Sequence, residues 1–172
     1  MIKILDTTKK GFRSTFEKIV LSRRNFDDKL YYKVNRIIND VKINGDRALI
    51  KYEKKFNNNS SIYPSEKKIQ NSINQLSLDV KKAIKNVYQG IYKWHKLQIR
   101  KNIIQKDRYG NKFSYIARPL DSCAVYCPGN LPSSALMNCI LANLAGVKRI
   151  VLCTPAVNGK LNGAVMYAAK LC

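Results

Sequence analysis

The sequence predicts an α/β protein with a helical amino-terminal region and a β-hairpin, followed by the first βαβα of an incomplete parallel sheet. In the first hundred residues, apolar side chains recur at helical spacing with lysines between them. From Ser122 onward the chain is nearly uncharged, and strand-like segments alternate with helix-like ones, which is typical of a parallel α/β layer. The change in composition divides the chain into regions 1–118 and 119–172.

The first well-marked helix is predicted to follow Asp27. Its apolar positions, at helical spacing, are Leu30, Val34, Ile37, Ile38 and Val41. We expect Gly45 to end this helix in the left-handed conformation and Asp46 to cap the next one. The polar run 57–61 then predicts a loop.

Two serines are predicted to cap the helices that follow. Ser65 precedes a short helix, and Ser77 precedes a longer one. The longer helix has an apolar stripe made of Val80, Ile84, Val87, Ile91 and Trp94. We interpret this stripe as a core face and not as a binding groove.

A β-hairpin is predicted after residue 98. The apolar segments 103–104 and 113–116 flank a turn at 107–111, in which Gly110 supplies the positive φ. Pro119 closes the hairpin because proline cannot donate to a strand ladder.

The last 50 or so residues predict a strand, a loop, a helix, a second strand and another helix. These segments are 123–127, 128–130, 133–145, 147–154 and 162–170. Pro132 near the first helical turn and Gly146 just past the end support the helix. Two strands are too few for an open parallel sheet, and the helical pattern still runs at Cys172. We therefore expect a truncated domain.

The formal charge of +21 raises the possibility of nucleic-acid binding. Lysine outnumbers arginine 23 to 9, although bidentate phosphate and guanine recognition favours arginine. Lys, Asn and Ile are abundant together, as an adenine- and thymine-rich genome would impose on any protein. We attribute the charge to that bias and regard nucleic acid as an improbable partner.

The cysteines and the first residues of the chain indicate the cellular compartment in which the protein works. Five cysteines without a CxxC pair, and a start without a secretory signal, predict a reduced cytoplasmic location. No apolar run approaches the roughly 20 residues of a membrane span.

The loop 128–130 is the local feature with the clearest functional rationale. It links a strand to a helix start, where backbone N–H groups suit a phosphate or carboxylate. A cofactor-binding loop and a plain connecting turn both remain open for it. Ser133 and Ser134 could cap the helix or contact an anion, and we favour capping.

Candidates for catalysis or metal binding are few. His95 is the only histidine, and we interpret it as a packed or surface-edge side chain. Cys123 and Cys127 would lie roughly 13 Å apart along one strand, too far to share a metal or a disulfide. The eleven carboxylates form no evident acid–base pair. We therefore assign no catalytic residue and no metal ligand within the chain.

Several ordered motifs resemble the histidinol dehydrogenase family. They are Val34–Phe56 with its Gly-Asp break, Trp94-His95-Lys-Leu-Gln98, Arg118–Gly129, Pro132–Asn138, Ala145–Val151 and Thr154-Pro155. The resemblance covers nearly the whole chain. It implies a Rossmann-like fold akin to aldehyde dehydrogenases and a homodimer that uses NAD and zinc. The implied reaction oxidises L-histidinol through L-histidinaldehyde to L-histidine.

The resemblance assigns few of the family's site residues to positions in this chain. It implies zinc ligands and a catalytic Glu-His pair beyond residue 172, and only Tyr126 matches a family NAD contact. The family's Pro-Gly-Gly is Pro128-Gly129-Asn130 here, in a loop about three residues shorter, and Ala124 stands where the family has glycine. A Cβ at position 130 limits positive φ and close ligand approach. The alternative is an inactive remnant of the enzyme.

Overall fold

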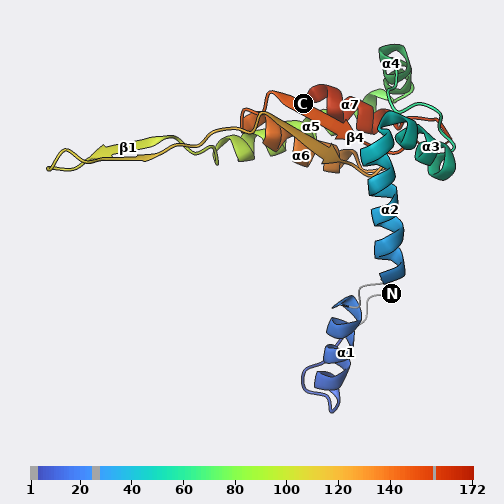
Figure 1. Ribbon diagram of the computed structural model, residues 1–172. Coiled ribbons are helices and arrows are strands. Elements are labelled where there is room, and N and C mark those ends of the chain that lie inside the picture. The colour runs from blue at the N-terminus through green and yellow to red at the C-terminus, as the bar shows by residue number, and fades with distance from the viewer. Residues whose placement is uncertain (1–3, 25–27, 157) are drawn as a thin grey trace. The chain divides into compact units, whose positions relative to one another are not determined.

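A computed structural model describes residues 4–24, 28–156 and 158–172. Figure 1 shows its elements, which are α1 (Phe12–Arg24), α2 (Asp28–Asn44), α3 (Asp46–Asn57), α4 (Glu66–Asn74), α5 (Leu78–Lys96), β1 (Ile103–Lys106), β2 (Lys112–Tyr115), β3 (Ser122–Tyr126), α6 (Pro132–Leu144), β4 (Arg149–Cys153) and α7 (Gly163–Leu171). They form two compact units, Met1–Leu49 and Ile50–Cys172. The architecture confirms the predicted α/β class, and the domain boundary expected after residue 118 stays a prediction.

The first unit consists of helices with little burial. The predicted break is confirmed: Gly45 has φ +53° and separates α2 from α3. Asp46 is the first residue of α3 and not its cap, so its carboxylate faces the positive end of the helix dipole instead. Asp27, the predicted start of α2, lies outside the described residues.

Both predicted serine caps of the second unit are confirmed. The Ser65 hydroxyl accepts from the Lys68 N–H, and the Ser77 hydroxyl accepts from the Val80 N–H, each at 3.3 Å. Each cap satisfies one of the N–H groups that a helix start leaves without a partner.

The predicted core face of α5 is only partly right. Ile84 is buried and Ile91 is half-buried, but Val80, Val87 and Trp94 are 41%, 47% and 63% exposed. The face that packs against the core includes Tyr88 and Tyr92, whose rings stack with centroids 5.9 Å apart. The buried side of α5 is therefore the side that carries these tyrosines, and Val80, Val87 and Trp94 lie outside it.

The predicted hairpin is confirmed. Strands β1 and β2 pair antiparallel, Gly110 has φ +85°, and Asp107 accepts bonds from the Tyr109 and Asn111 N–H groups at the turn. All eight strand residues are exposed, and the ribbon extends away from the helices of its own unit (Figure 1).

Strands β3 and β4 form a parallel pair joined by α6, which is a βαβ unit. Ala124 is registered with Val151, and Tyr126 with Cys153. Helix α6 begins at Pro132, has no side-chain cap, and ends before Gly146, whose φ is +87°. Ser133 and Ser134 therefore lie inside the first turn, and the capping role predicted for them is wrong.

The core of the second unit lies among α4, α5, α6, α7 and the end of β3. Its buried members are Ile73, Ile84, Cys127, Ala135, Leu136, Ile140, Val165, Met166 and Ala168. Helix α7 approaches α4 so closely that a Cβ at Gly163 would collide with the Ser72 carbonyl. Among the described residues, no helix is both long and apolar enough to cross a membrane.

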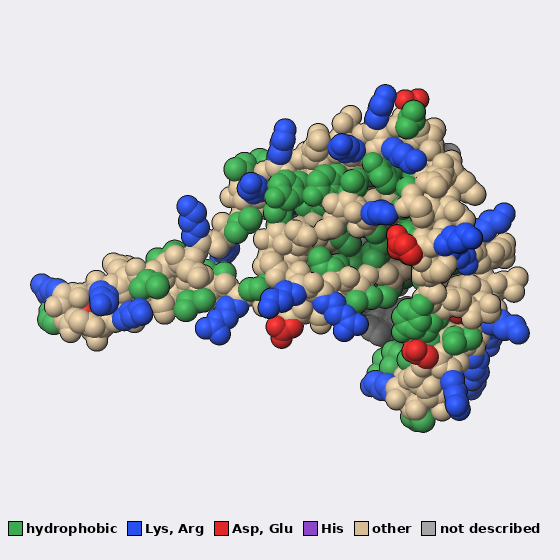
Figure 2. Space-filling model, turned by 90° about the horizontal axis from the view of Figure 1, so that it is seen from above, with side chains coloured by type: hydrophobic (Ala, Val, Ile, Leu, Met, Phe, Trp, Pro, Cys, Tyr) green, Lys and Arg blue, Asp and Glu red, His purple; other side chains and the backbone are tan. Residues whose placement is uncertain are grey.

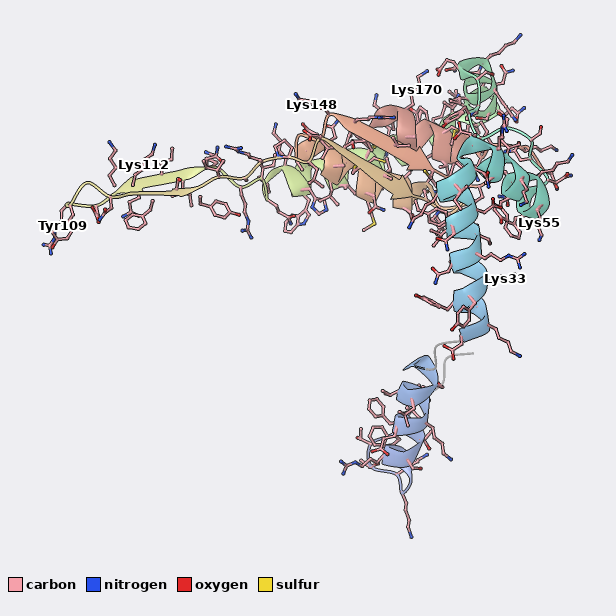
Figure 3. The ribbon with its side chains drawn as sticks, viewed as in Figure 1. Lys33, Lys55, Tyr109, Lys112, Lys148 and Lys170 are labelled. Atoms are coloured by element: carbon pink, nitrogen blue, oxygen red, sulfur yellow. The ribbon has the colours of Figure 1, made fainter. Side chains whose placement is uncertain are left out.

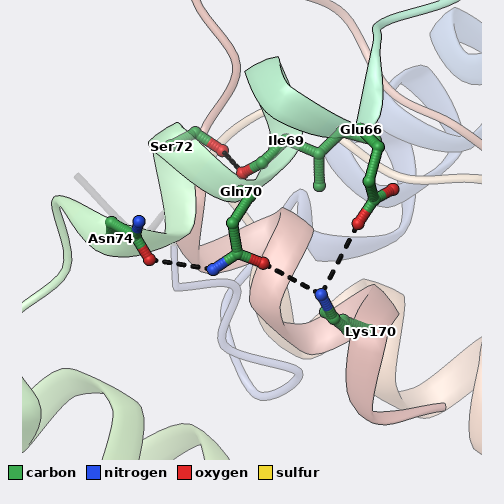
Figure 4. A network of polar contacts seen from close by, with 6 residues as sticks. All are labelled: Glu66, Ile69, Gln70, Ser72, Asn74 and Lys170. Carbon is green, nitrogen blue, oxygen red and sulfur yellow. Dashed lines mark hydrogen bonds and ion pairs between the residues drawn. The ribbon is translucent and has the colours of Figure 1, made fainter.

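Polar contacts on the surface join α4 to α7 (Figure 4). The Lys170 ammonium donates to Gln70 Oε1 at 2.9 Å and lies 3.5 Å from Glu66 Oε1. Gln70 in turn donates to Asn74 Oδ1 at 2.8 Å. This network lies at the exposed surface between the helix that follows β4 and α4.

Candidate functional site

An open pocket of about 600 Å³ lies just past the carboxyl ends of β3 and β4. Its walls are Gly129, Asn130, Pro155, Asn158, Lys160, Leu161 and Asn162. The strand pairing continues one residue past β3, because the Cys127 N–H donates to the Cys153 carbonyl at 2.9 Å. Ligands of open α/β sheets bind at this end of the strands, so the pocket is the candidate site.

The first wall of the pocket is the loop after β3, and a buried thiol holds it. Cys127 is fully buried, and its Sγ donates to the carbonyls of Leu131 at 3.2 Å and Pro128 at 3.4 Å. Burial raises the pKa of the Cys127 thiol, so the group stays a protonated donor at neutral pH. The Leu131 N–H also donates to the Pro128 carbonyl at 3.1 Å, which closes the turn.

The glycine of this loop approaches the second wall closely. A Cβ at Gly129 would stand 3.0 Å from the Pro155 carbonyl oxygen, so a side chain there would push the two loops apart. Asn130 is not among the described residues with positive φ, so its Cβ causes no backbone strain in this loop. The Asn130 side chain instead lines the pocket.

The second wall follows β4 and brings one cation to the pocket, Lys160. Asn162 caps α7 by accepting from the Ala164 and Val165 N–H groups, so its carbonyl oxygen is already used. The Thr154 hydroxyl lies between β4 and this wall and is buried without a hydrogen-bond partner. The residues of this wall carry no motif of their own in the sequence, although the end of the second predicted strand was a usable signal.

Tyr126 ends β3 immediately before the first wall. Its side chain is 71% exposed and lies on the face of the β3–β4 pair opposite Val125, which is buried. Tyr126 is not among the residues that line the pocket, so its ring would contact only a ligand that extends past the pocket toward β3.

His95 and the cysteines form no metal centre. His95 Nδ1 lies 2.8 Å from Gln98 Oε1, so these two residues of the Trp94–Gln98 motif pair with each other. All five cysteines are free thiols. Within the described ranges, no three His, Cys, Asp or Glu side chains gather where a metal ion could bind.

Basic side chains are scattered and do not gather at the pocket. On the face in Figure 2, Lys and Arg side chains are spread over most of the surface and do not form a single patch. The lysines labelled in Figure 3 come from separate elements, such as Lys112 on β2 and Lys170 on α7.

Comparisons with known proteins agree on one family. A family model described as histidinol dehydrogenase matches residues 21–172. Histidinol dehydrogenase of Pelagibacter ubique is 49% identical over all of this chain, and that of Gluconobacter oxydans is 32% identical over 99% of it. A crystal structure of histidinol dehydrogenase from Elizabethkingia anophelis covers 83% of the chain with a TM-score of 0.78 and 35% identity. The chain spans 41% of the length of the first two relatives and 34% of the solved chain.

Proposed function

Because the chain belongs to the histidinol dehydrogenase family, we propose that it forms the dinucleotide-facing part of an enzyme that oxidises L-histidinol to L-histidine through the aldehyde. The pocket at the carboxyl ends of β3 and β4 carries this proposal. In the whole enzyme this part would bind NAD, and a longer polypeptide would supply the substrate site. The homodimer, the cytoplasmic location and the exclusion of nucleic acid stay predictions.

The residues around the pocket fit NAD. Tyr126 offers an exposed ring for stacking, and Lys160 offers a positive charge for a pyrophosphate. Gly129, which lines the pocket, adds no side chain of its own to it. When bound, NAD would supply the hydride acceptor for the two oxidations.

The described residues do not fit zinc. They hold no group of three metal-ligating side chains, so no step through zinc is derived from this chain. His95, the single histidine, is paired with Gln98. We therefore propose that the 172-residue chain alone binds the dinucleotide weakly and does not turn over L-histidinol. This is the alternative of an inactive remnant, and it is favoured for the isolated polypeptide because the described residues hold no metal-ligating group.

NAD binding by the purified chain tests the proposal. Titration calorimetry should detect binding that weakens about five-fold or more in Tyr126→Ala, since stacking of a base on an aromatic ring contributes about 1–3 kcal/mol. Tyr109→Ala is the matched control because Tyr109 is 74% exposed and lies at the tip of the hairpin, away from the pocket. That variant should bind NAD as the unchanged chain does.

Two results would count against the proposal. Equal loss of binding in both tyrosine variants would show that the contact is nonspecific. Turnover of L-histidinol by the purified chain would overturn its non-catalytic role. A Lys160→Gln variant refines the assignment, because loss of the lysine should weaken NAD binding and also reduce its salt dependence.

A further inference from the structure

Two cysteines from different helices meet where α6 packs against α7. Cys139 lies within α6, and Cys172 directly follows the last residue of α7. Their thiols are hydrogen-bonded to each other, and the Cys172 sulfur also lies 3.3 Å from the Ala168 carbonyl oxygen. A separate contact places the end of α7 here, because the Asn143 side-chain amide donates to the Cys172 carbonyl at 2.8 Å. Asn143 follows Cys139 by one helical turn, so both contacts come from one face of α6.

The two thiols differ in burial and in how readily they ionise. Cys139 is 3% exposed, whereas Cys172 is half-buried and partly accessible to solvent. The hydrogen bond with Cys172 lowers the pKa of Cys139, although burial acts against it. The same bond, together with burial, raises the pKa of Cys172. Cys139 therefore has the greater thiolate character, and Cys172 is a protonated thiol beside it.

The other three cysteines are arranged differently. Cys123 and Cys153 lie on opposite faces of the β3–β4 pair, and Cys127 is bonded to two backbone carbonyls of its own loop. The thiols of Cys139 and Cys172 contact each other directly. Two sulfurs do not complete a metal site, because zinc takes four ligands and the described part of the chain gathers no group of three. A reaction between the two sulfurs is the chemistry that this contact allows.

We propose that Cys139 and Cys172 form a reversible disulfide, so that the contact between α6 and α7 is a redox-sensitive modification site whose oxidant is a peroxide. The Cys139 sulfur attacks one oxygen of hydrogen peroxide, the O–O bond breaks, and a sulfenic acid and one water result. The Cys172 sulfur then attacks the sulfenic sulfur, the S–O bond breaks, and the hydroxide leaves with the thiol proton as a second water. Two thiols and one peroxide thus give one disulfide and two waters, and an added dithiol reverses the change.

The disulfide would tie the segment between α6 and α7 into a covalent loop. That loop contains β4 and the wall of the candidate pocket that follows it, including Lys160. A cross-link removes conformations from the unfolded chain, so the oxidised form should unfold at a higher temperature than the reduced form. Neither sulfur lines the pocket, so the proposal does not depend on NAD binding.

Hydrogen peroxide at a one-to-one ratio to the purified 172-residue chain tests the site. Tandem mass spectrometry of proteolytic peptides should find Cys139 joined to Cys172, and thermal unfolding should rise by about 5 °C or more. Dithiothreitol should reverse both changes. Cys172→Ser should form no bridge to Cys139 and should lose the thermal shift. Cys153→Ser is the matched control, because Cys153 is exposed on β4 and takes no part in the pair, so this variant should keep both.

Several results would overturn the site. They are Cys139 oxidised beyond the sulfenic acid without a bridge, a bridge from Cys139 to a cysteine other than Cys172, and oxidation of Cys153 with the pair left reduced. A thermal shift that persists in Cys172→Ser would also overturn it, as would loss of the bridge in Cys153→Ser. If circular dichroism shows that Cys172→Ser does not fold, Cys172→Ala replaces it and is held to the same outcomes, since alanine also lacks the sulfur but adds no polar group.

Discussion

Helices α2 and α6 show that an apolar stripe and burial are different properties. In α2 the apolar residues recur at regular helical spacing between charged ones, yet none of its residues is buried. Helix α6 has no charged residue and is apolar nearly all round, and Ala135, Leu136, Cys139 and Ile140 are buried in it. The periodic pattern predicts a helix in both cases. Whether its apolar side is covered depends on a packing partner, which α6 finds in α5, α7 and the strands of its own unit.

The largest expected effect compares one isoleucine from each helix. Ile140→Ala in α6 should lower the free energy of unfolding by about 2–5 kcal/mol, because Ile140 is 1% exposed within the core. Ile38→Ala in α2 should cost well under 1 kcal/mol, since Ile38 is 43% exposed. Urea denaturation followed by circular dichroism measures both. A comparable loss in the two variants would mean that α2 is packed in solution as tightly as α6.

A smaller effect is expected where α7 meets α4. Gly163→Ala should destabilise the second unit by about 1–3 kcal/mol or more, because the new Cβ collides with the Ser72 carbonyl and a backbone must move. Gly90→Ala in α5 is the control: no atom lies within 4 Å of a Cβ built there, and alanine favours helix by roughly 0.5–1 kcal/mol. Thermal unfolding should therefore shift in opposite directions. Destabilisation by Gly90→Ala would show that α5 is covered at that position.

Local features were predictable from the sequence because neighbouring residues determine them. The Ser65 and Ser77 caps each involve a residue and an N–H group three positions on. The glycines at 45, 110 and 146 all have the positive φ that a helix end or tight turn requires. The βαβ order was predictable for the same reason, since each segment has its own composition.

Features that depend on distant segments were not predictable. The rotation of the buried face of α5 comes from what packs on Tyr88 and Tyr92, which the spacing of aliphatic residues does not encode. Helix α6 begins at Pro132 without a side-chain cap, so the two serines that follow were misassigned. Lys160 joins Gly129 at the pocket only through the pairing of β3 and β4. The sequence therefore indicated the wall of the candidate site that follows β3, but not the wall that follows β4.

The surface network between α4 and α7 should contribute little. Lys170→Met should change the free energy of unfolding by less than about 1 kcal/mol, because the Lys170 and Glu66 side chains are 54% and 77% exposed and solvent screens the pair. A double-mutant cycle with Glu66→Gln isolates the pair from the Gln70 bond. A coupling above that value would show that the network helps to set the position of α7, as Gly163 does.

The smallest effect is confined to the hairpin, whose eight strand residues are all exposed. The pKa of Asp107 is lowered from its usual 3.8, chiefly by the hydrogen bond from the Asn111 side chain and also by backbone N–H groups of the turn. A lowered pKa in the folded turn means that the ionised carboxylate stabilises the turn above about pH 3.8, and that this contribution is lost as the pH falls through the lowered value. Amide signals of Tyr109 and Asn111 should therefore shift together on acidification by NMR, while signals from α6 stay in place. Asp107→Asn should remove this titration. A simultaneous change in α6 would show that the hairpin and the core unfold as one unit, so the hairpin would be packed in solution more like α6 than its exposure indicates.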